Sequence, residues 1–84
     1  MTRQELAIEQ KALADKLTML TKQTAQWKAI FLNDSRIFAE NPTPDNKMNL
    51  DISAKHLHLN ERWKNEAWCR YVAHQTKYGV LLDQ

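Results

Sequence analysis

The sequence predicts an all-α protein built as one long antiparallel helical hairpin. Apolar residues recur three and four positions apart in two long stretches, the spacing of a packed helix face. The two prolines lie close together in a polar segment between those stretches, and the single glycine is far from them. Few residues therefore interrupt a helix, and the lack of glycine argues against β-hairpins. The 84 residues form one domain, 1–84.

The first helix is predicted over residues 3–40. Thr2 and Glu5 have the spacing of a capping box, which satisfies free backbone donors at a helix start. Asn33–Ser35 could end the helix and cap a new short one, but Ile37 and Phe38 continue the apolar spacing beyond them, so we expect the helix to continue, with a kink near 33–35 as an alternative. One face has the spacing of a helix packed lengthwise on another, and it consists of Leu6, Gln10, Leu13, Leu17, Leu20, Thr24, Trp27 and Phe31.

Residues 41–49, with Pro42 and Pro44, are predicted to form the loop. The second helix is expected over 51–78, with Gly79 as a left-handed cap and an apolar tail at 80–84. At 100° per residue its apolar residues form two stripes. The broad stripe, expected to face the first helix, contains Ile52, His56, Leu59, Trp63, Ala67, Tyr71, His74 and Tyr78; the narrow one contains Leu57, Trp68 and Val72.

A hairpin covers one stripe of the second helix and leaves the other exposed. We therefore expect a homodimer in which two hairpins form a four-helix bundle. A compact three-helix monomer, closed by the tail and a bent first helix, is the alternative.

Composition excludes several classes of function. Twelve basic and ten acidic residues give a net charge of +2, which is too balanced to imply nucleic acid by itself. No apolar run approaches the roughly 20 residues of a membrane span. One cysteine, Cys69, and no secretory signal predict a cytoplasmic protein.

Catalytic and metal sites are not predicted. His56 and His58 are two residues apart on a helix and diverge, as do Cys69 and His74 at five apart, so zinc ligation is disfavoured. With Gly79 as the only glycine, the chain cannot build a phosphate-binding loop. We expect no enzyme activity, cofactor or metal.

The narrow stripe of the second helix is predicted to be a contact surface, either for a larger partner protein or for a second copy of the chain. Tryptophan is the kind of side chain that most often dominates protein interfaces. The expected contact residues are Trp68, Leu57, Val72 and Lys64. Trp63 is expected in the core instead.

A basic side of the second helix supplies a second hypothesis. Lys55, Arg62, Arg70 and Lys77 are spaced to follow a phosphate backbone, although Glu66 interrupts them.

Three functions follow from the sequence. The preferred one is a small protein-binding accessory or inhibitor of the phage or mobile-element type. The alternatives are a nucleic-acid-binding regulator and a structural subunit of a larger assembly.

Overall fold

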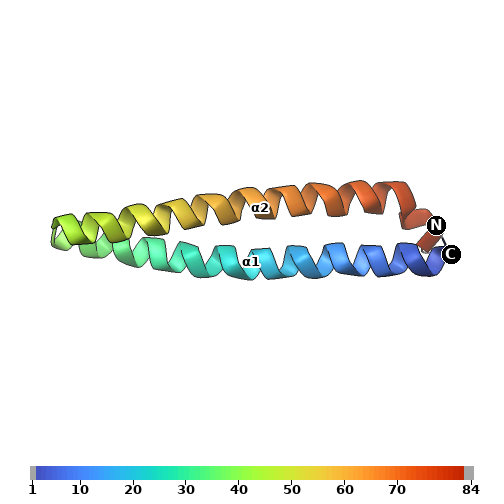
Figure 1. The fold of residues 1–84 in the computed structure, drawn as a ribbon, viewed down its shortest axis with the longest axis horizontal. Coiled ribbons are helices and arrows are strands. Elements are labelled where there is room, and N and C mark those ends of the chain that lie inside the picture. Colours follow the sequence, from blue (N-terminus) through green and yellow to red (C-terminus); the bar gives the residue numbers. More distant parts are fainter. Residues whose placement is uncertain (1, 83–84) are drawn as a thin grey trace.

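Two antiparallel α-helices make up the part of the protein that the structure describes (Figure 1). The computed structural model of the chain describes residues 2–82. Helix α1 runs from Arg3 to Glu40 and helix α2 from Pro44 to Leu82, and the described residues contain no strand. The hairpin is a rod with principal extents of 58 × 15 × 13 Å, and both ends of the chain lie at the end opposite the turn. The predicted all-α hairpin is confirmed.

Helix α1 has the predicted limits and no break at 33–35. Thr2 forms its N-cap, because its hydroxyl accepts a hydrogen bond from the Glu5 backbone N–H at 3.2 Å and donates to Glu5 Oε1 at 3.1 Å. At Asn33 the helix is supported by a contact along its surface, where Arg36 donates to Asn33 Oδ1. The kink considered as an alternative near 33–35 is therefore absent.

The predicted loop at 41–49 was too long. The turn occupies residues 41–43, because Pro44 is the first residue of α2 rather than a helix breaker. Proline is favoured at this position, since its missing N–H would have no partner there. Thr43 caps the helix, accepting from the Asn46 N–H at 3.2 Å through its hydroxyl, and Asn46 in turn donates to the Asn41 carbonyl.

The predicted end of α2 at residue 78 was also wrong. Gly79 has no positive φ and continues the helix, so residues 80–82 form its last turn, while 83–84 lie outside the described residues. This glycine is buried, and a Cβ there would come within 2.8 Å of Gln75 Nε2. Gly79 therefore makes room for the Gln75 side chain instead of reversing the chain.

The inner seam is the strip of buried and half-buried residues along which α1 and α2 face each other. On α1 it is the predicted face, Leu6 to Phe31. On α2 its residues alternate strictly at three and four positions, which is the repeat of a coiled coil. They are Leu50, Ser53, Leu57, Asn60, Lys64, Ala67, Tyr71, His74 and Tyr78.

Only part of the broad stripe predicted for α2 faces α1. Ala67 and His74 are buried and Tyr71 and Tyr78 are half-buried, but Ile52 and Trp63 are 48% and 46% exposed. The expectation that Trp63 belongs to the hairpin core is therefore wrong. The predicted stripe had grouped Trp63 with Ala67, four residues later, but the two side chains lie on different faces of the helix.

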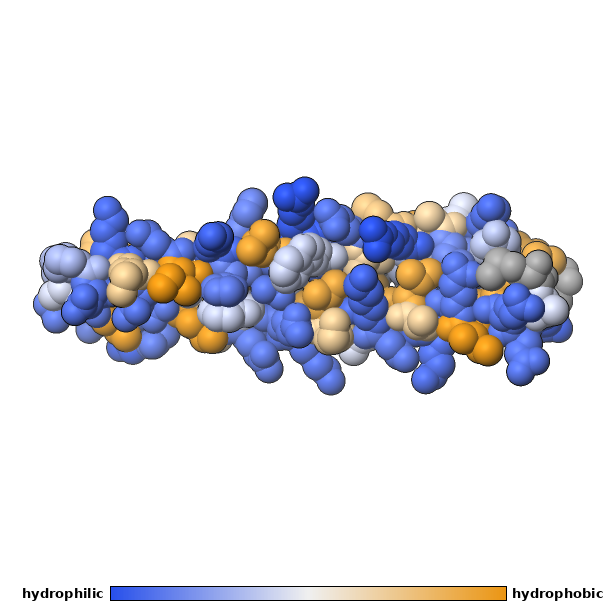
Figure 2. Space-filling model, in the orientation of Figure 1, coloured by the Kyte–Doolittle hydropathy of each residue, from blue (hydrophilic) through white to orange (hydrophobic). Residues whose placement is uncertain are grey.

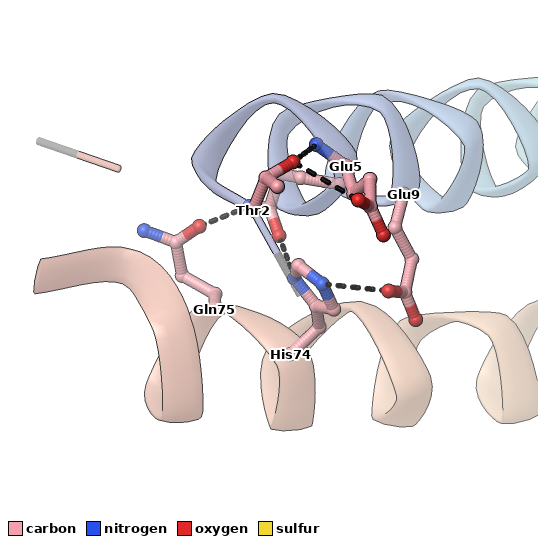
Figure 3. Close-up of polar contacts among 6 residues, drawn as sticks. Thr2, Glu5, Glu9, His74 and Gln75 are labelled. Atoms are coloured by element: carbon pink, nitrogen blue, oxygen red, sulfur yellow. Dashed lines mark hydrogen bonds and ion pairs between the residues drawn. The ribbon is translucent and has the colours of Figure 1, made fainter. Parts of the chain in front are cut away.

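The register of the seam follows from the contact between Gln10 and His74 (Figure 3). With the same three-four spacing on both helices, this contact places Leu17 opposite Ala67 and Phe31 opposite Ser53. A large side chain faces a small one at these two places, where the helices can pack closely, whereas Leu13 faces Tyr71. The seam contains more buried polar than buried apolar residues: Thr24, Ser53, Asn60 and His74 against Leu6, Leu20 and Ala67.

A polar cluster fixes the open end of the hairpin (Figure 3). Gln10 accepts a hydrogen bond from His74 Nδ1 through Oε1 and donates through Nε2 to Gln75 Oε1. His74 is 7% exposed, and its Nε2 lies 3.6 Å from Glu9 Oε2. The ring of Tyr78 covers the imidazole, with 4.9 Å between centroids. These contacts exist only in one register, so the cluster specifies how the helices align.

Replacing Gln10 by Ala leaves the buried Nδ1 donor of His74 without its acceptor. We expect the free energy of unfolding to fall by about 1–3 kcal/mol in chemical denaturation. Gln4→Ala, at an exposed position one and a half turns earlier, is the control and should change it by less than about 0.5 kcal/mol. Equal losses for the two variants would contradict the role of the cluster.

Asn60 is buried in the inner seam with an incomplete set of hydrogen bonds. Its Nδ2 donates to the His56 carbonyl, but its buried Oδ1 has no partner among the described residues. Asn60→Leu removes this group and fills the seam, so the free energy of unfolding should rise by about 1–2 kcal/mol. Asn65→Leu, on the exposed side of α2, should leave it nearly unchanged. A less stable Asn60→Leu variant would show that the amide stabilises the fold.

Candidate functional surface

The surface of the hairpin is rich in exposed apolar side chains for so small a protein. Figure 2 shows orange and tan patches between blue polar ones along the whole face in view. Among the residues that the structure describes, twelve large apolar side chains are exposed, and apolar surface on this scale is typical of contact surfaces. They are Ile8, Met19, Ile30, Leu32, Ile37, Met48, Ile52, Trp63, Trp68, Val72, Val80 and Leu81.

The predicted partner-binding residues do not form one surface. Leu57 and Lys64 are half-buried members of the inner seam. Lys64 lies opposite Leu20 in the seam register, where an aliphatic stem can cover apolar surface while the ammonium reaches water. Trp68 and Val72 are 54% and 40% exposed and lie one turn apart on α2. Of the four predicted residues, only these two remain as a contact surface, which we call the Trp68 edge.

Tyr71 extends the Trp68 edge. It is half-buried on the inner seam, and its ring stacks against the indole of Trp68 with 6.1 Å between centroids. A stacked aromatic neighbour restricts the rotamers of Trp68, so less conformational entropy is lost when a partner covers the indole. The edge is thus a rigid aromatic projection rather than a cavity.

A second exposed surface lies on the other side of the inner seam. Met19 and Trp63 line one groove of about 330 Å³ between the helices, together with Lys16, Leu20, Gln23, Glu66, Ala67 and Arg70. The groove is at the lower limit for small-molecule sites and is open to solvent. Farther towards the turn, Trp27 and His56 stack across the helices at 4.3 Å. The α1 residues of this surface were not predicted from the sequence.

A larger hollow of about 560 Å³ carries no site. Its lining comes from α2 alone, so it has no opposing wall to enclose a ligand. The residues are His58, Glu61, Arg62, Asn65, Glu66, Cys69 and Arg70. Within residues 2–82, no group of three His, Cys, Asp or Glu side chains is placed to hold a metal ion.

The four basic residues proposed for nucleic acid are all exposed. At 100° per residue they lie within an arc of about 80° around α2. Arg62 also makes an ion pair with Glu66, at 3.4 Å. The basic side is therefore a broken band along the helix, partly neutralised at its centre.

No protein-family model, curated protein or solved structure matches this chain. None of the helices within residues 2–82 has the length and apolar character needed to cross a membrane.

Proposed function

We propose that this protein is a non-enzymatic accessory or inhibitor that binds a larger protein through the Trp68 edge. The observation that supports this is an indole more than half exposed, beside Val72 and held against Tyr71. Contact between an indole and water is unfavourable, so a partner that covers the indole gains free energy of binding. Tryptophan is also the residue type most enriched among interface hot spots.

The rod supports such a role physically. A helix presents its side chains at fixed spacing, so a surface that is already helical does not have to order when a partner binds. The single cysteine is exposed and unpaired, which suits a partner in the reducing cytoplasm. No catalytic residue is needed, since covering a partner's surface is sufficient to inhibit or assemble it.

Trp68→Ala should abolish capture of the partner and leave the thermal midpoint nearly unchanged, because the side chain lies outside the inner seam. The measurement compares proteins retained from an extract by immobilised wild type and variants, followed by the affinity of the recovered partner. Met48→Ala, an exposed apolar residue near the turn, is the matched control and should retain the same protein. Retention that survives Trp68→Ala would contradict the proposal.

The alternative of a nucleic-acid-binding regulator rests on four exposed basic side chains spread over about 33 Å of α2. It predicts an affinity that falls steeply with salt. Arg62→Ala with Lys77→Ala should then fold normally and bind nucleic acid more weakly, measured by fluorescence anisotropy. Binding unchanged by the double substitution would eliminate this alternative. A structural subunit of a larger assembly, the third possibility, would make the isolated chain poorly stable.

A further inference from the structure

A second seam, the outer seam, runs along one side of the hairpin. On α1 it consists of residues spaced three and four apart and all exposed: Met19, Gln23, Gln26, Ile30, Asn33 and Ile37. On α2 the same spacing gives four exposed residues and the half-buried Leu59: Asn49, Ile52, His56, Leu59 and Trp63. The groove shared by Met19 and Trp63, and the stack of Trp27 on His56, place both rows on the same side.

The outer seam contains no Asp, Glu, Lys or Arg over its whole length. Charges begin where it ends, with Lys16 on α1 and Glu66 and Arg70 on α2. The opposite side of the same stretch is interrupted by charges, at Lys28, Asp51 and Glu61. An exposed, uncharged row at helix-packing spacing is typical of a face that another helix covers.

We propose that the outer seam is covered by a second copy of this chain, packed antiparallel to the first. Two hairpins joined along this side form a four-helix bundle in which Trp63 becomes buried between the copies. This inference does not depend on the Trp68 edge, which stays exposed on the other side of the bundle.

The pattern of the seam is symmetric, as a two-fold axis requires. Met19 and Ile37 lie nine residues on either side of position 28. On α2, the midpoint between Ile52 and Leu59 lies within one residue of position 56. The register of the inner seam places positions 28 and 56 side by side, so both helices have their centre of symmetry at the same level. With the two-fold axis there, α1 lies on α1 of the second copy, and Met19 of each copy faces Ile37 of the other.

The orientation follows from this symmetric pattern and not from the charges beyond the outer seam, which are of both signs, with Glu9 and Lys16 on α1 and Glu66 and Arg70 on α2. In the antiparallel arrangement the open ends of the two hairpins project away from each other.

The accessible surface of the isolated hairpin is also large enough to include a dimer interface. Its accessible surface is 6295 Å², whereas a compact chain of 9.9 kDa exposes roughly 5,200 Å². The excess of about 1,100 Å² exceeds the approximately 800 Å² that each partner buries in a stable interface. The low net charge of +2 adds little repulsion between copies.

Light scattering on the purified chain at micromolar concentration should give twice the mass of one chain. Ile30→Glu and Ile52→Glu, each placing a charge in the outer seam, should each give a monomer that remains helical by circular dichroism. Leu32→Glu, equally apolar and exposed but outside the outer seam, is the control and should stay dimeric. A monomeric wild type, or dimers unaffected by both isoleucine substitutions, would overturn the proposal.

The orientation can be tested on the natural sequence by a nitroxide label on the exposed Cys69. Position 69 lies thirteen residues from position 56, so the antiparallel dimer separates the two labels by about 40 Å along the bundle. Pulsed electron paramagnetic resonance should therefore give a distance of about 40–50 Å. A parallel dimer would bring the labels level and closer than about 30 Å, which would contradict the arrangement, as would the absence of any dipolar coupling.

Discussion

The inner seam between α1 and α2 is the constraint on which the rest of the structure depends. Its residues repeat at three and four positions on both helices, so the two faces stay in contact along the whole rod. The contacts of Gln10 with His74 and Gln75 exclude other alignments. Since each residue has one place in this register, the seam also determines which side chains remain on the surface.

The composition of that seam explains why the surface is so apolar. Ser53, Asn60 and His74 occupy positions that leucine or isoleucine fill in a self-sufficient coiled coil. Buried polar groups specify an alignment but contribute less stability than apolar ones. A two-helix rod with so few buried apolar residues needs further cover, and the uncharged outer seam can supply it through a second copy. The Trp68 edge then remains available to a different protein.

The helices could be predicted from the sequence to different degrees. The limits of α1 and the face that it packs against α2 could be predicted, because most of its seam residues are apolar and Thr2 and Glu5 mark its start. The face of α2 was assigned wrongly over its first half, since polar Ser53, Asn60 and Lys64 conceal the seam while apolar Ile52 and Trp63 lie outside it. Proline and glycine usually end helices, but here Pro44 begins α2 and Gly79 continues it.

The most direct test of this account is the thermal midpoint of the wild-type chain as a function of protein concentration. If the polar inner seam leaves the single hairpin folded but only marginally stable, and the outer seam is covered by a second copy, unfolding is coupled to dissociation. The midpoint should then rise steadily with concentration. A midpoint that stays constant over a hundredfold range, with a single-chain mass throughout, would show that the hairpin is stable with its outer seam exposed.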